Sequence, residues 1–167
     1  MKKKLQKLLK NQKGLTLVEL LAVVVILGII AAIAVPSIAG IIDNSKKDAH
    51  IANAEQLVGA ARLAVASNDK KTLKATTPVS TDLTYKISMQ TLVDNGYLET
   101  DIEDPDDTDD TPGYKTRDSY VTVKMDGNKA SYKVYLIGEK RSVAESNTAK
   151  TTAVAPSALT RDNVVNN

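Results

Sequence analysis

The sequence contains no cysteine, which excludes disulfide bonds, thiol catalysis and zinc sites built on sulfur. Its single histidine, His50, excludes a metal site with several histidine ligands. Phe and Trp are absent and all six aromatic residues are tyrosines, so a surface for base stacking would have few aromatic rings. No glycine-rich phosphate loop is present, and His50 lies in no recognisable Ser/His/Asp motif. We therefore expect that the chain is not an enzyme and binds no organic cofactor.

The 167 residues suffice for one domain with a modest core, and the 43% hydrophobic and 25% charged composition is ordinary for a globular chain. The net charge of +2 is unevenly distributed, because the segment up to Gly14 has no acidic residue and is rich in lysine. Beyond Gly14 the chain is net acidic. The lysines of this first segment are Lys2, Lys3, Lys4, Lys7, Lys10 and Lys13.

The segment from Leu20 to Ile42 lacks any charged residue and consists mostly of Leu, Val, Ile and Ala. As a helix it would extend roughly 35 Å, enough to cross a hydrocarbon layer of ~30 Å. A buried core helix is the alternative, but so small a domain could hardly surround it. A secretory signal peptide would have a shorter apolar region, of about 7–15 residues. The preceding lysines predict a single-pass protein of the cell membrane with a cytoplasmic N-terminus and the chain after Ile42 outside.

Glu19 stands directly before this apolar run, where a carboxylate costs roughly 2.5–3.5 kcal/mol by insertion scales. No lysine or arginine occurs between residues 14 and 45 to pair with it. Cleavage after Gly14 would create a new α-amine on Leu15, four residues before Glu19. That amine could pair with Glu19 of the same chain or, after assembly, of a neighbouring chain.

The segment Lys13-Gly14-Leu15-Thr16-Leu17-Val18-Glu19-Leu20, followed by an apolar helix, resembles the processing site of type IV pilins and pseudopilins. In that family, prepilin peptidase cuts after the glycine on the cytoplasmic side, and the new terminal residue is N-methylated. The resemblance implies a leader over residues 1–14, cleavage between Gly14 and Leu15, methylation of Leu15, and a role for Glu19 in assembly. The family most often has Phe where this chain has Leu15.

Two helix-weakening residues lie within the predicted transmembrane and assembly helix, residues 15–42. Gly28 lowers helix propensity by about 1 kcal/mol, and Pro36 removes a backbone hydrogen bond. Both are tolerated in membrane helices generally. In the family that the chain resembles, a proline here marks helix curvature, so residues 28–36 are candidates for local extension during assembly.

Residues 43–69 are amphipathic and predict a continuation of the same helix, with a narrow, alanine-rich apolar face. On this helix His50 is expected to be a solvated side chain. Residues 70–137 predict a small α/β head: a short helix after Ser88, and a hairpin over 119–137 that turns at Asp126-Gly127-Asn128. Residues 138–167 have few large apolar side chains and predict an exposed or loosely packed polar tail. The expected fold class is α+β and pilin-like, with a long N-terminal helix packed on a small antiparallel sheet.

The head contains an acidic loop over residues 99–110, in which eight of twelve residues are Asp or Glu. A solvated loop is the simpler interpretation, and a calcium site is the functional alternative, since calcium takes six to eight oxygen ligands. An EF-hand is excluded, because the turn glycine and the closing glutamate are missing. The candidate calcium ligands are Asp104, Asp106, Asp107, Asp109 and Asp110.

The predicted function is that of a structural subunit of a type IV pilus or pilus-like filament, displayed on the cell surface after leaving the membrane. The alternative is a minor or competence pseudopilin in a short pseudopilus that moves DNA or secreted protein. Expected partners are further copies of the chain, other pilins, prepilin peptidase and the pilus assembly machinery. DNA is a further candidate that the sequence does not indicate, since residues 115–167 are only mildly basic.

Overall fold

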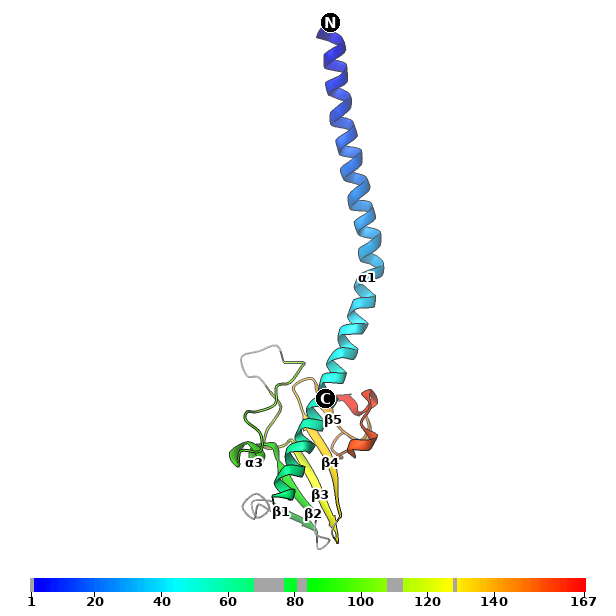
Figure 1. Cartoon of the computed structure of the whole chain (residues 1–167). Helices are drawn as coiled ribbons and strands as arrows, with labels where there is room; N and C mark the ends of the chain where they lie inside the picture. Colours follow the sequence, from blue (N-terminus) through cyan, green and yellow to red (C-terminus); the bar gives the residue numbers. More distant parts are fainter. Residues whose placement is uncertain (1, 68–76, 81–83, 108–112, 128) are drawn as a thin grey trace. The chain divides into compact units, whose positions relative to one another are not determined.

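The computed structural model describes residues 2–67, 77–80, 84–107, 113–127 and 129–167, with side chains described throughout these ranges except at 2–15 and 77–80. The first element is a long helix, α1 (Lys2–Ala66) (Figure 1). The chain divides into two compact units, which we call the N-terminal unit (Met1–Asp43) and the C-terminal unit (Asn44–Asn167). The boundary falls inside α1, so this helix contributes to both units.

In the N-terminal unit, the described apolar side chains are largely exposed. From Thr16 to Ile42 almost every side chain is exposed, and the large ones retain between 52% (Val23) and 71% (Ile33) of their accessible surface. Among the described residues, one helix is long and apolar enough to cross a membrane, and this segment of α1 is its apolar part. The helix passes through Gly28 and Pro36 without a break. Local extension of residues 28–36 during assembly stays a prediction.

The C-terminal unit contains a sheet of six described strands that follow one another in chain order, all neighbours antiparallel. This arrangement confirms the α+β, pilin-like class expected from the sequence. The elements after α1 are β1 (Thr77–Ser80), β2 (Thr84–Ser88), α3 (Met89–Asp94), β3 (Tyr120–Asp126), β4 (Lys129–Ile137), β5 (Arg141–Val143), the 3₁₀ turns η1 (Pro156–Ala158) and η2 (Arg161–Asn163), and β6 (Val164–Asn166).

The core of the C-terminal unit lies between the second part of α1 and one face of the sheet. The helix contributes small and medium apolar residues at three- and four-residue spacing, the face predicted from the sequence. The alternate residues of β2, β3 and β4 supply the opposing layer. Fully buried residues of these two layers include Ala54, Leu57, Ala61 and Ala64 from α1, and Ile87, Val121, Val123, Val134 and Leu136 from the strands.

Two local predictions are confirmed in detail. The Ser88 side chain caps α3 by accepting a hydrogen bond from the Thr91 amide at 3.2 Å, and Gly96 follows the helix with a φ of 76°. Strands β3 and β4 form the predicted hairpin with Asp126 opposite Lys129, and Gly127 takes the positive φ of 59° that this turn requires.

The prediction of a loosely packed tail over residues 138–167 is wrong. This segment forms β5, η1, η2 and β6, and it extends the sheet beyond β4. All four of its valines and two of its alanines are buried: Val143, Ala144, Ala153, Val154, Val164 and Val165. The buried Asn163 side chain donates hydrogen bonds to the Ala144 and Glu145 carbonyls. Strand pairing and these two side-chain hydrogen bonds therefore hold the segment in place, although it has few large apolar residues.

Candidate functional site

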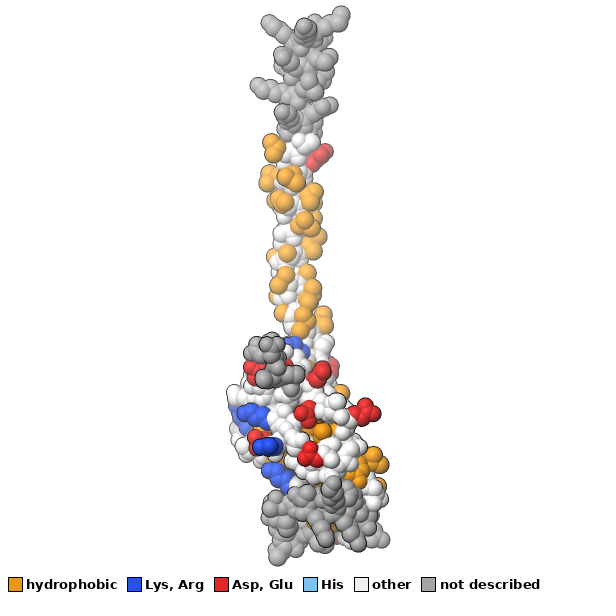
Figure 2. Space-filling model, turned by 90° about the vertical axis from the view of Figure 1, so that its left-hand side faces the viewer, with side chains coloured by type: hydrophobic (Ala, Val, Ile, Leu, Met, Phe, Trp, Pro, Cys, Tyr) orange, Lys and Arg blue, Asp and Glu red, His pale blue; other side chains and the backbone are white. Residues whose placement is uncertain are grey.

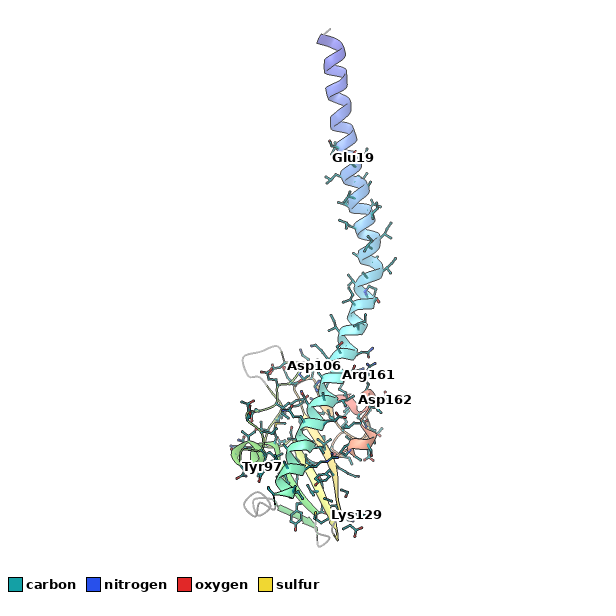
Figure 3. The ribbon with its side chains drawn as sticks, in the orientation of Figure 1. Glu19, Tyr97, Asp106, Lys129, Arg161 and Asp162 are labelled. Atoms are coloured by element: carbon teal, nitrogen blue, oxygen red, sulfur yellow. The ribbon has the colours of Figure 1, made fainter. Side chains whose placement is uncertain are left out.

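The predicted processing and assembly residues lie on one continuous helical segment in the N-terminal unit. Gly14 and Leu15 belong to α1, but their side chains lie outside the described residues. Glu19 is exposed on α1 among the apolar side chains of Leu17 and Leu20, which are 68% and 63% exposed (Figure 3). Within the described residues of this unit, no cationic side chain is available to Glu19, because the next lysine is Lys46.

A cluster of charged and polar side chains lies inside the C-terminal unit, and the sequence analysis did not predict it. Asp104 and Asp106, from the acidic loop, are 5% and 3% exposed, so the prediction of a solvated loop is wrong for these two residues. Asp107 is half-buried and accepts a hydrogen bond from the Gly113 amide at 2.9 Å. Asp109 and Asp110 lie outside the described residues. We call the assembled side chains the buried polar cluster: Lys46, His50, Asp104, Asp106, Tyr114 and Arg141.

His50 lies at the centre of the buried polar cluster and is fully buried, so the prediction that it is solvated is wrong. Its Nε2 atom is 3.0 Å from Asp106 Oδ2, and its Nδ1 atom is 2.6 Å from the Tyr114 hydroxyl. The Tyr114 oxygen also accepts a hydrogen bond from the Asn53 amide at 3.3 Å. Both ring nitrogens of His50 thus have a hydrogen-bonding partner inside the C-terminal unit.

Three nitrogen-bearing side chains contact the Asp106 carboxylate. Besides His50, the Lys46 ammonium lies 3.2 Å from Oδ1, and Arg141 Nε lies 3.3 Å from Oδ2. Burial alone would raise the pKa of Asp106, but the hydrogen bonds from His50 and Lys46 and the charge of Arg141 outweigh burial and lower the pKa. Burial also raises the pKa of Tyr114, which therefore stays protonated.

Asp104 is held mainly by the backbone. Its Oδ1 accepts a hydrogen bond from the Asp106 amide at 2.9 Å, and its Oδ2 accepts one from the Glu139 amide at 2.7 Å. The position of Gly138 matters here, because a Cβ at that residue would overlap the Asp104 carboxylate. The buried polar cluster thus joins α1, the acidic loop and the turn between β4 and β5.

The arrangement offers a poor site for calcium. His50, Asp104 and Asp106 could each direct one ligand atom to a common point, since these atoms lie within 4.8 Å of one another. Calcium, however, prefers six to eight oxygens. The ammonium of Lys46 and the guanidinium of Arg141 already neutralise the two carboxylates at the cluster. These two cations and two carboxylates balance in charge without a metal, and calcium binding stays an untested prediction.

A signal for the burial of His50 was present in the sequence. Position 50 continues the series 54, 57, 61 and 64, which is the apolar face of α1. Its partners, by contrast, could not be identified, because Asp106 and Tyr114 are 56 and 64 residues away along the chain.

Comparison with known proteins yields one match, and it covers the N-terminal segment alone. Residues 9–35 match the family model described as the prokaryotic N-terminal methylation motif. No curated protein and no solved structure matches the chain. The matched residues include Gly14, Leu15 and Glu19 together with the first part of the exposed apolar run. Residues 9–35 therefore contain the type IV prepilin signal, in a chain whose architecture is α+β and pilin-like.

Proposed function

We propose that this chain is a structural subunit of a type IV pilus or pilus-like filament. The observation that supports this most directly is the methylation motif at residues 9–35, placed on a helix whose apolar side chains remain exposed. A helix of this kind is stable in a membrane or against identical helices, because both remove its apolar surface from water. The prepilin signal is typical of a structural protein family, and the chain is a substrate of processing enzymes.

In this proposal prepilin peptidase cuts between Gly14 and Leu15, and Leu15 is N-methylated. Before the cut, the lysine-rich leader holds the N-terminus in the cytoplasm, and the C-terminal unit lies outside the membrane. After the cut, the Leu15 amine is the cation that Glu19 lacks within its own segment. In a filament this amine and the Glu19 carboxylate of the adjacent subunit pair away from water and set the register between subunits. The subunit then leaves the membrane and becomes part of an extracellular pilus.

A minor or competence pseudopilin is the second candidate, since the same motif serves both kinds of subunit. Relative copy number distinguishes them: a major subunit dominates the sheared surface fraction, and a minor one is scarce there.

The experiment that tests the proposal is mass spectrometry of the protein sheared from the surface of its native host. We expect a mature chain that begins at Leu15 and has a methylated amine. The variant Gly14→Asp should remain uncut in the membrane. A mature terminus at Met1, or beyond Ala39, would refute the processing proposed here.

A further inference from the structure

We propose that the C-terminal units of neighbouring copies contact each other through two surfaces of opposite charge. One is an acidic edge made by Glu99, Asp101 and Glu103, and the other is a basic sheet face made by Lys86, Lys124 and Lys133. The occupant of each surface is a second copy of this chain. This inference rests on the proposed assembly of copies into a filament and adds a second contact to that of the N-terminal helix.

The acidic edge consists of exposed residues in the segment after α3. Leu98, Ile102 and Asp104 turn inward and are buried, whereas Glu99, Asp101 and Glu103 are exposed. The three carboxylates therefore lie in water along one side of an ordered segment that buried neighbours hold in place. Figure 2 faces this side of the C-terminal unit and shows acidic side chains beside small apolar patches, with Lys and Arg side chains on one flank.

Beside the acidic edge lies a groove of about 370 Å³ between α1 and this segment. Its α1 wall includes Gln56, Gly59, Ala60 and Leu63, and its other wall is residues 97–102. Leu63 is 58% exposed, in contrast to the buried residues of the same helix. An apolar floor with carboxylates on its rim fits a lysine side chain, which can bury its alkyl stem while its ammonium stays at the charged rim.

The basic sheet face follows from strand register. Lys86, Thr122 and Lys133 are direct partners across β2, β3 and β4, and Lys124 stands opposite Ser131 in a neighbouring row. Directly opposed residues share a face. Their neighbours along each strand, such as Ile87, Val121 and Val134, face the core. All three lysines are therefore exposed on the side of the sheet away from α1.

The geometry makes the contact intermolecular. The groove and the acidic edge lie on the α1 side of the sheet, and the lysines lie on the opposite side. The two surfaces of one unit cannot meet each other, but those of two units can. Two different patches in contact form a heterologous interface, which propagates into a filament unless its rotation closes a ring. The acidic edge repels a second acidic edge, and the basic sheet face, on which lysines outnumber the exposed Asp126, repels a second basic face.

The test reverses each surface in the full chain, expressed as the sole copy in its native host. One variant carries Glu99→Lys, Asp101→Lys and Glu103→Lys, and the other carries Lys86→Glu, Lys124→Glu and Lys133→Glu. A single exposed ion pair contributes little, so three charges are reversed together. We expect each triple variant to lower the sheared filament yield about tenfold, while mature protein in the membrane stays at the wild-type level.

Co-expression of the two variants tests whether the two surfaces contact each other. The first variant has two basic surfaces and the second two acidic ones, so alternating copies restore both kinds of contact. We expect mixed filaments at a yield well above that of either variant alone. Glu145→Lys and Lys140→Glu, two exposed charges outside both surfaces, should leave the yield unchanged.

Wild-type yield from either triple variant would overturn the inference, as would the absence of rescue on co-expression of two variants with normal mature protein. The variant with Lys86→Glu, Lys124→Glu and Lys133→Glu is also compared with the wild type for DNA retention. If this variant assembles normally but only the wild type retains DNA, the basic sheet face binds a polyanion instead. Failure of the proposed function is distinguishable, because then the wild-type chain itself would be absent from filaments.

Discussion

The two units of this chain differ in the surroundings of their apolar and charged side chains. In the N-terminal unit, Ile33 keeps 71% of its surface exposed and Glu19 has no cationic side chain among its described neighbours. In the C-terminal unit, Leu57 and Ile87 are fully buried, and Asp106 has Lys46, His50 and Arg141 around it. These apolar and acidic groups of the C-terminal unit are thus surrounded by its own residues, whereas those of the N-terminal unit remain exposed.

This contrast separates two kinds of consequence for a substitution. Removing a charge from the N-terminal unit should alter assembly and leave the folding of the C-terminal unit unchanged. Removing a charge from the buried polar cluster should lower the free energy of unfolding of the C-terminal unit and leave processing intact.

The largest effect is expected for Glu19→Ala. The variant should be inserted and cleaved normally, because the residues around Gly14 are unchanged. In the filament the Leu15 amine would then lack its partner, and one unpaired buried charge costs about 3–5 kcal/mol. With the variant as the sole copy, we expect mature protein in the membrane and none in the sheared fraction. Glu55→Ala, at an exposed position of the same helix, is the matched control. A normal filament yield from Glu19→Ala would leave Glu19 without the role assigned to it.

A smaller effect, confined to the C-terminal unit, is expected for Asp106→Asn. The amide keeps the shape of the side chain but removes the negative charge that Lys46 and Arg141 contact. Breaking such a pair costs about 3 kcal/mol, which corresponds to a fall in Tm of about 10 °C for a unit of this size. Thermal unfolding of residues 44–167, followed by circular dichroism, measures the change.

Asp48→Asn is the matched control for this measurement. Asp48 accepts two hydrogen bonds of 2.6 Å from Arg161, but both side chains are about half exposed, so the loss should be slight. The pH dependence sharpens the comparison. The folded state lowers the pKa of Asp106, so its contribution is present above about pH 4 and is lost as the pH falls through the folded-state pKa. The wild type should lose more stability in acid than Asp106→Asn; equal acid sensitivity would contradict the role of this carboxylate.

The confirmed predictions are those that depend on local sequence. The apolar run, the apolar face of α1, the Ser88 cap and the β3–β4 hairpin each follow from periodicity or turn chemistry over a few residues. The prediction of a loosely packed tail over residues 138–167 is wrong because β5 and β6 are each only three residues long. Their order comes from pairing with strands that the local sequence does not identify. Pairing of that kind leaves no pattern in a short segment.

The same distinction between local and long-range contacts applies to the candidate functional residues. The processing residues around Gly14 and Glu19 are contiguous, so a single sequence segment predicts them. The buried polar cluster combines residues from four separate segments, and local sequence predicts burial for none of its charged residues. A histidine on a helix, a run of aspartates and an arginine in a polar tail are all ordinarily solvated. Only the fold brings them together, and together their charges compensate one another.

The smallest effect is expected for calcium. A calcium ion at the acidic loop would have to displace Lys46 and Arg141 from Asp106, and backbone amides from Asp104. We therefore expect calcium and a chelator to give the same Tm for residues 44–167, within about 1 °C. A bound ion at a hundredfold excess over its Kd would instead add about 2.7 kcal/mol, a shift of several degrees. A rise of that size, reversed by chelation and abolished in Asp109→Asn/Asp110→Asn, would restore the loop as a calcium site. The same rise unaffected by that double variant would place the ion at the buried polar cluster, and Asp104→Asn should then remove it.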